Sequence, residues 1–392
     1  MATPPTSPPT HGAAPARPSS RDEFIDLVRA FSLLVVVMWH WVFTIVVWRP
    51  SGPSASSPLA FTDELWLLTW LLQVMPLFFF VGGYAHLQLW TKVRSAGGGW
   101  LAFVYGRAKR LLVPSLALLA VWGGLAVLVE SLFDAPWFSR AALLIVSPLW
   151  FIAVYLMLVA ITPLAVWLHQ KMGPVAVVLL AGTAFLVDVL RFGRGLGWTA
   201  LVNLVVVWAL CHQLGFFYRK LADGPRTTAW SFALGGLIGL TGLVLTNIYP
   251  ASMVGVPGDR FSNMGPPTLC IAALCFFQTG LLMLVRPWVL RRLEQPSWAR
   301  ASDVVNRFAL PLFLFHTTGY ALAFALLYLV GWRTPDTPTA AWWLQRPLWL
   351  LLPLACTVPV ILLFGRRWIS GTKPPPKPVA DLEPMIVMDS RW

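Results

Sequence analysis

The sequence predicts an all-α integral membrane protein, a bundle of about ten transmembrane helices with both termini on the cytoplasmic side. Three observations support this fold class. Of the 392 residues, 57% are hydrophobic and only 11% are charged, whereas about 25% of the residues of a soluble domain are charged. Apolar stretches long enough to cross a bilayer recur along the chain. The basic residues alternate between connecting segments as membrane topology requires.

Ten apolar stretches each come close to the roughly 20 residues that cross a bilayer. The second and fourth are longer and are expected to tilt or kink, with Pro76 and Pro163 as candidate kink sites. The ten stretches cover residues 30–48, 65–90, 111–131, 141–168, 173–190, 198–217, 230–248, 268–285, 308–330 and 347–364.

The distribution of basic residues predicts which side of the membrane each end faces. With a cytoplasmic N-terminus, 22 of the 29 Lys and Arg residues fall in segments on the cytoplasmic side and 7 in segments outside. This asymmetry follows the positive-inside rule. We therefore expect a multi-pass protein of the cytoplasmic membrane. The net charge of +13 then reflects topology rather than a nucleic-acid-binding surface, because the basic residues are scattered among short loops.

Residues 21–365 are expected to form one membrane domain. Residues 1–20 before it are rich in Pro, Ser and Thr without an apolar core, which predicts a disordered tail rather than a signal peptide. Residues 366–392 after it include a run of three prolines and are expected to be a flexible cytoplasmic tail. The longest outside segment, about 249–267, is rich in Gly and Pro, which predicts an irregular loop capping an external cavity.

Two ionisable residues mark the first apolar stretch. Arg29 and His40 are eleven residues apart, so on a helix they share one face and lie about 16 Å apart along the axis. With a cytoplasmic N-terminus, Arg29 lies at the cytoplasmic mouth and His40 near the bilayer midplane. Ionisable groups inside a membrane are costly and usually functional. We therefore interpret His40 as a general base or proton relay; the alternative is a polar residue satisfied by a neighbouring helix.

Further charged residues accompany Arg29. Asp26 lies three residues before it on the same side of the helix; it either orients the Arg29 guanidinium or acts as a carboxylate at the helix start. Arg107, Lys109 and Arg110 precede the third stretch. Together with Arg29 they suit a phosphate-bearing ligand such as a nucleotide. Ordinary inside-positive flanking and contact with lipid headgroups is the alternative.

Other polar or small residues interrupt the later stretches. Gly83 belongs to a glycine pair that permits close approach of a helix or a ligand, with helix packing as the default. His86 is expected at the cytoplasmic interface, and Asp188 near an outer helix end, facing an external acceptor. Trp150 suits packing or an aromatic belt, and His316 is a further histidine inside the membrane. The four cysteines lack metal-ligand spacing, so we expect no metal site.

In combination, these motifs resemble integral-membrane acyltransferase family 3, the O-acyltransferases of bacterial surfaces, over about residues 21–365. The family's first-helix pattern is an Asp, an Arg three residues on, then ten residues and a His. Asp26, Arg29 and His40 match it. Four further motifs follow in the family's order: Phe79–Tyr84, in which Gly82 replaces a serine, the Arg107–Arg110–Pro114 run, Leu149–Trp150–Phe151, and loosely Phe315–His316.

The resemblance implies an acyltransferase for groups other than aminoacyl groups. The donor would be a cytoplasmic acyl-CoA, a co-substrate rather than a permanently bound cofactor. The acceptor would be a hydroxyl of a cell-surface glycan or related compound. An acetyl group is one candidate for the acyl group transferred. Some relatives acylate secondary metabolites, so a secreted metabolite is the alternative acceptor.

The resemblance also implies roles for individual residues. Arg29, Arg107 and Arg110 would hold the donor's phosphates, and His40 would deprotonate the acceptor hydroxyl or carry the acyl group itself. The supporting residues would be Asp26, Gly83, Trp150 and His316.

Two rival functions remain: a multi-pass transporter of a small molecule, although no paired broken helices are visible, and a non-enzymatic membrane partner or sensor. The sequence leaves the oligomeric state open.

Overall fold

The computed structural model describes residues 22–50 and 52–369. The predicted tail 1–20 lies outside these residues, as does the part of the predicted tail 366–392 that follows Ile369. The described part of the chain is mostly helical, as predicted, with one small two-stranded sheet.

The elements follow one another in an up-and-down order. The α-helices are α1 (Glu23–Val42), α2 (Trp66–Leu72), α3 (Met75–Ser95), α4 (Trp100–Phe133), α5 (Trp137–Val146), α6 (Trp150–Met172), α7 (Val175–Asp188), α8 (Ala200–Gly215), α9 (Tyr218–Ala222), α10 (Arg226–Leu245), α11 (Leu269–Leu293), α12 (Pro296–Leu329), α13 (Ala340–Leu344) and α14 (Arg346–Val360). The strands are β1 (Ile45–Arg49) and β2 (Gly52–Ser56). Short 3-10 or π turns are η1 (Pro58–Ala60), η2 (Asp63–Leu65), η3 (Ser147–Leu149), η4 (Val189–Gly193), η5 (Gly197–Thr199), η6 (Ile361–Gly365) and η7 (Arg366–Trp368).

Ten helical segments of the described residues are long and apolar enough to cross a membrane, which confirms the predicted number. The two long segments are compound. One breaks between α2 and α3, directly before Pro76 in the first turn of α3, as a proline at the start of a helix favours. The other changes helix type at η3, around Pro148, whereas Pro163 lies inside the continuous helix α6.

The first predicted stretch, 30–48, has different ends in the structure. Helix α1 begins earlier because Asp22 caps it, accepting a hydrogen bond from the backbone N–H of Ile25. It ends at Val42, and β1 then pairs antiparallel with β2, with Ile45 opposite Ser56. The expectation of a helix through residue 48 was wrong. The run of β-branched residues in β1 favours an extended strand over a further helical turn.

Helix α3 lies at the centre of the bundle, in contact with α1, α6, α8 and α11. Two glycines set its distance from α8. A Cβ atom at Gly83 would collide with the backbone carbonyl of His212, and one at Gly215 would collide with that of Phe80. Close approach therefore requires a bare backbone on both helices, the packing role expected of glycine in membrane helices.

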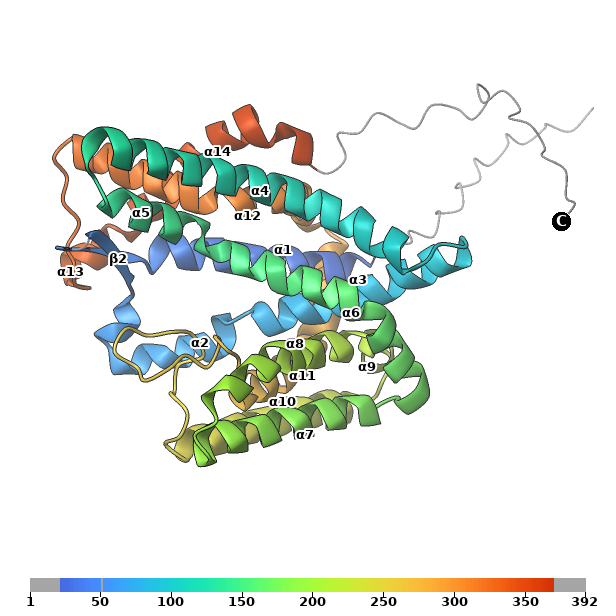
Figure 1. Cartoon of the computed structure of the whole chain (residues 1–392). Helices are drawn as coiled ribbons and strands as arrows, with labels where there is room; N and C mark the ends of the chain where they lie inside the picture. The colour runs from blue at the N-terminus through green and yellow to red at the C-terminus, as the bar shows by residue number, and fades with distance from the viewer. Residues whose placement is uncertain (1–21, 51, 370–392) are drawn as a thin grey trace, which may run out of the picture.

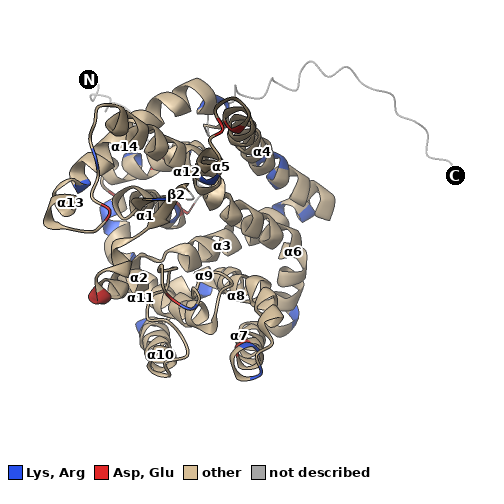
Figure 2. Cartoon of the chain, turned by 60° about the vertical axis from the view of Figure 1, so that its left-hand side comes forward, with Lys and Arg blue, Asp and Glu red and all other residues tan. Residues whose placement is uncertain are grey.

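The outer faces of the bundle are apolar. Large hydrophobic side chains are exposed along them, for example Leu116 and Val127 on α4 and Ile238 on α10. Figure 2 shows how few charged residues interrupt these helices. Such extended apolar surfaces suit contact with lipid.

The two ends of the bundle differ in structure. The β1–β2 hairpin, α2, α13 and the irregular segment 246–268 gather at one end, and α9 lies at the other (Figure 1). We call the first the hairpin end, and the second, where α1 begins, the Arg29 end.

Candidate functional site

Three contacts join α1 to α12 along a shared face. At the Arg29 end, Arg29 Nε donates to Asn306 Oδ1 at 2.7 Å. Toward the hairpin end, Trp41 Nε1 donates to the backbone carbonyl of His316 at 2.9 Å. Between them, His40 Nδ1 lies 3.1 Å from His316 Nε2. The two histidines are therefore partners, a pairing that the spacing along either helix could not indicate.

The hydrogen bonds of His316 determine which nitrogens carry protons. His316 Nδ1 lies 2.7 Å from the backbone carbonyl oxygen of Phe313, and a carbonyl only accepts, so Nδ1 is protonated. In the neutral ring, His316 Nε2 is then a bare acceptor, which receives the Nδ1–H of His40. His40 Nε2 is left without a proton, the form required of a general base or a nucleophile.

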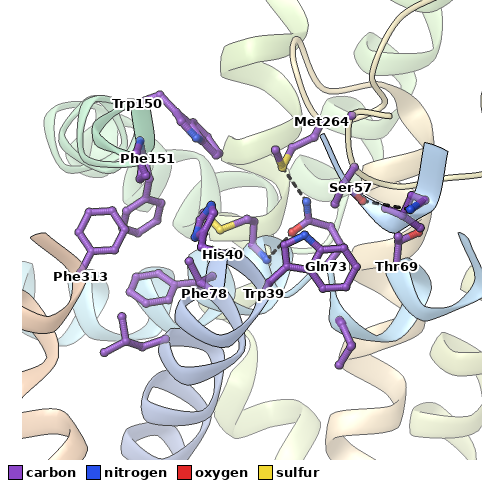
Figure 3. A pocket seen from close by; sticks show the side chains of 18 residues that line it. Trp39, His40, Ser57, Thr69, Gln73, Phe78, Trp150, Phe151, Met264 and Phe313 are labelled. Carbon is purple, nitrogen blue, oxygen red and sulfur yellow. Dashed lines mark hydrogen bonds between the residues drawn. The ribbon is translucent and has the colours of Figure 1, made fainter. Parts of the chain in front are cut away.

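His40 lines a cavity of about 230 Å³, which we call the histidine cavity. Figure 3 shows Trp150, Phe151 and Phe313 on one side of His40, and Gln73 with Trp39 on the other. The labelled wall residues besides His40 are Trp39, Ser57, Thr69, Gln73, Phe78, Trp150, Phe151, Met264 and Phe313. Gln73 is held by both ends of its amide: Nε2 donates to Met264 Sδ at 2.6 Å, and Oε1 accepts from the backbone N–H of Met75 at 3.2 Å. The amide is thereby fixed in the wall of the cavity.

The irregular segment 246–268, which includes the predicted irregular loop 249–267, forms part of the wall of this cavity. Val254, Gly255 and Met264 from this segment line the cavity. The segment is tied to α2 by two hydrogen bonds: Trp70 Nε1 donates to the Ala251 carbonyl at 2.9 Å, and the Met253 N–H donates to Thr69 Oγ1 at 2.9 Å.

Asp188 anchors both ends of the same segment. Its Oδ2 accepts from the Tyr249 hydroxyl at 3.1 Å and from the Leu269 N–H at 2.8 Å, and its Oδ1 accepts from Asn203 Nδ2 at 2.9 Å. Burial and the nearby Asp188 carboxylate raise the pKa of Tyr249, so its hydroxyl stays protonated and donates. Asp188 is fully buried, and the expectation that it faces an external acceptor was wrong. The loop needs a buried acceptor at this point.

A second cavity, of about 600 Å³, lies toward the Arg29 end; we call it the arginine cavity. It brings together the three predicted phosphate-binding residues, Arg29, Arg107 and Arg110. Charged residues in its wall are Asp26, Arg29, Arg107, Arg110, Asp303 and Arg307. Four guanidinium groups against two carboxylates leave an excess of positive charge, which suits a polyanionic ligand.

The role of Asp26, which the sequence left open, is that of orienting Arg29. Arg29 Nη2 donates to Asp26 Oδ1 at 2.8 Å, while Asp22 serves as the helix cap. The guanidinium also donates to Asn306 Oδ1. Asn306 is itself fixed, because its Nδ2 donates to the backbone carbonyl of Asp26 at 2.8 Å. The Arg29 side chain nevertheless remains 36% exposed, so a ligand in the cavity can reach it.

The two cavities adjoin at a set of apolar residues, which we call the constriction. Leu33, Phe78, Phe151 and Phe313 line both of them. Leu33 lies between Arg29 and His40 on α1. The helix face that the Arg–His spacing predicted therefore runs from the cationic cavity to the histidine, along the apolar residues that the two cavities share.

The remaining predicted site residues fall in different places. Trp150 lines the histidine cavity, and His316 lies behind His40. Gly83 lies at the α3–α8 contact and lines neither cavity; its neighbour Gly82 lines the arginine cavity. His86, which was expected at the cytoplasmic interface, has its side chain fully buried within the bundle.

Asn306 and Phe313 were not recognised in the sequence, whereas Phe151 of the constriction belongs to the Leu149–Trp150–Phe151 motif. A signal was present on α12, where Asn306, Leu310 and Phe313 follow one another at helical spacing and all line the arginine cavity. Asn306 begins this series at the Arg29 end of α12, as Arg29 begins the corresponding series on α1.

Comparison with known proteins identifies one family. A family model described as an acyltransferase domain matches residues 22–364, nearly the whole of the described chain. No curated protein and no solved structure shows a significant match.

Proposed function

The chain belongs to acyltransferase family 3, and from that premise we propose that it moves an acyl group from a cytoplasmic acyl-CoA to a hydroxyl of a cell-surface glycan or related acceptor. The observation that carries the proposal is that two adjoining cavities lie along one face of α1. One is cationic, and the other holds a histidine with an unprotonated Nε2.

The arginine cavity supports the donor side of the proposal. Coenzyme A carries several phosphates, and planar guanidinium groups bind phosphate oxygens through paired hydrogen bonds. Arg29, Arg107 and Arg110 would hold these phosphates at the Arg29 end, which the charge distribution predicts to be cytoplasmic. The arm would pass Leu33 and bring the thioester to His40, about 16 Å along the helix axis.

The chemistry then follows from the state of His40. His40 Nε2 removes the proton of the acceptor hydroxyl as the oxygen attacks the thioester carbonyl carbon. The carbon–sulfur bond breaks, the acyl group passes to the oxygen, and the thiolate takes the proton back from His40. The alternative route, in which His40 Nε2 first carries the acyl group, uses the same nitrogen.

The histidine cavity supports an acceptor that enters from the hairpin end. Trp39 and Trp150 offer flat aromatic faces, and the amide of Gln73 offers polar contacts. A sugar hydroxyl and the hydroxyl of a small secreted metabolite would both meet these groups, and the glycan is the acceptor proposed here.

The decisive experiment compares cells that produce the wild-type protein with cells that produce His40→Ala. Mass spectrometry of envelope glycans and of secreted metabolites should find an acylated product with the wild type and none with the variant. Purified wild-type protein should also release free coenzyme A from acyl-CoA when the acceptor is present. Acylation that persists in a folded, membrane-inserted His40→Ala protein would refute the role of His40. Substrate flux without any acylated product would favour a transporter.

A further inference from the structure

A second buried histidine pair lies beside the arginine cavity. His86 of α3 and His212 of α8 face each other, with His86 Nδ1 3.0 Å from His212 Nε2. The other nitrogen of His86, Nε2, lies 2.9 Å from the hydroxyl oxygen of Tyr155 on α6. Both imidazoles are buried, whereas Tyr155 is partly exposed and lines the cavity. A chain of three polar groups thus leads from the core of the protein to the wall of the cavity.

His212, at the buried end of this series of polar groups, determines in which direction the hydrogen bonds run. His212 Nδ1 is buried and has no hydrogen-bond partner among the described residues. With neutral rings, either His212 Nε2–H donates to His86 and leaves Nδ1 bare, or the chain runs the other way and leaves a buried N–H unsatisfied. Orphaned N–H groups are the rarer case in folded proteins. The favoured arrangement therefore has His212 donating to His86 and His86 Nε2–H donating to the oxygen of Tyr155.

The Tyr155 hydroxyl then still has its own hydrogen available to donate. Its oxygen accepts from His86, and the hydroxyl has no other partner among the residues described. Tyr155 lies one helical turn from Phe151 of the constriction, on the side toward the arginines. A ligand that extends from the arginines to the constriction would pass it.

We propose that Tyr155 donates a hydrogen bond to a carbonyl oxygen of the donor's pantetheine arm, and that His86 and His212 are positioning residues that fix the direction of this bond. The inference rests on the proposed function, because it assumes an acyl-CoA in the arginine cavity. The amide carbonyls of the arm are acceptors of the kind that a fixed hydroxyl donor recognises.

The test measures binding to the purified full-length protein in lipid nanodiscs by calorimetry. Two ligands are used: coenzyme A, and adenosine 3′,5′-diphosphate, which carries phosphates and base but no arm. Tyr155→Phe should weaken coenzyme A binding by roughly 3- to 10-fold, the effect of one neutral hydrogen bond, and leave the diphosphate affinity unchanged. In turnover the KM for acyl-CoA should rise while kcat stays near the wild-type value.

Variants of His86 separate positioning from a merely structural role. His86→Gln places an amide donor near the position of Nε2 and should keep the affinity for coenzyme A, whereas His86→Leu should match Tyr155→Phe. Tyr105→Phe, on the exposed face of α4, is the matched control and should behave as wild type. Since His86→Leu could disturb folding, the Tyr155 result decides the outcome.

Two results would overturn the inference in distinguishable ways. If the wild type binds coenzyme A and Tyr155→Phe binds it equally well, the inference is wrong and the proposed function stands. If the wild type binds neither ligand, the proposed donor is wrong, and the inference fails with it. Equal weakening toward both ligands would assign Tyr155 to the shape of the cavity and would also refute the proposed bond.

Discussion

At the scale of single residues, each reactive group is held by another buried side chain. His316 holds His40 through one nitrogen, and Asp26 and Asn306 hold Arg29 from two directions. Such outer partners set the tautomer or orientation of the group that meets the ligand. The reactivity of His40 therefore depends on a residue that lines neither cavity.

This dependence predicts the behaviour of two His316 variants. His316→Leu removes the acceptor for the His40 Nδ1–H, so the ring can rotate or change tautomer. Because the base itself is retained, kcat should fall roughly 10- to 100-fold, less than the roughly 100- to 10,000-fold that general base catalysis contributes. His316→Gln supplies an amide oxygen near the position of Nε2 and should recover a large part of this loss. Steady-state kinetics with acyl-CoA and the identified acceptor measures both.

The affinity for the donor provides the control for this experiment. His316 does not line the arginine cavity, so coenzyme A should bind both variants as it binds the wild type. If His316→Gln were as impaired as His316→Leu although both fold, the acceptor role of His316 Nε2 would be refuted.

At the scale of the elements, most of the fold could be predicted because each helix carries its own signal. A stretch of about 20 apolar residues needs no partner to be recognised, and all ten spans were found. The end of α1 was misplaced because the β1 residues are as apolar as a helix, so hydropathy alone cannot distinguish them. The His40–His316 pair could not be predicted because it joins residues 276 positions apart, and periodicity reports only on local structure.

The contact between α3 and α8 gives a prediction for two adjacent glycines. A Cβ at Gly83 would collide with the backbone of α8, whereas one at Gly82 would lie 3.7 Å from Tyr155 Cε2, an ordinary contact. Gly83→Ala should therefore lower the thermal unfolding midpoint markedly, since overpacking against backbone costs about 1–3 kcal/mol or more. Gly82→Ala should change it little, because Ala also favours the helix.

Thermal unfolding followed by size-exclusion chromatography in one detergent compares the two variants directly. Equal midpoints for Gly83→Ala and wild type would mean that α3 and α8 are farther apart than described here. Loss of donor binding in Gly82→Ala at normal stability would instead show that its side of the arginine cavity is tightly filled.

At the scale of the whole molecule, the bundle contains two cavities that differ in charge and lie toward opposite ends. The arginine cavity faces the Arg29 end and carries the positive charge, while the histidine cavity lies under the loop at the hairpin end. The transfer reaction proposed here needs this polarity, because donor and acceptor come from opposite sides of a membrane. The function therefore depends on which end is cytoplasmic, and the charge distribution predicts that it is the Arg29 end.

Two single-cysteine variants test that orientation. Lys220→Cys lies on α9 at the Arg29 end and Asp259→Cys in the segment 246–268, and both positions are exposed. A membrane-impermeant maleimide applied to intact cells should label Asp259→Cys and should label Lys220→Cys only after permeabilisation. The unmodified protein is the control for its own four cysteines, of which Cys211, Cys270 and Cys275 are buried. The reverse pattern would place the arginine cavity outside the cell, where cytoplasmic acyl-CoA could not reach it, and would refute the proposed direction of transfer even if acyltransferase activity were found.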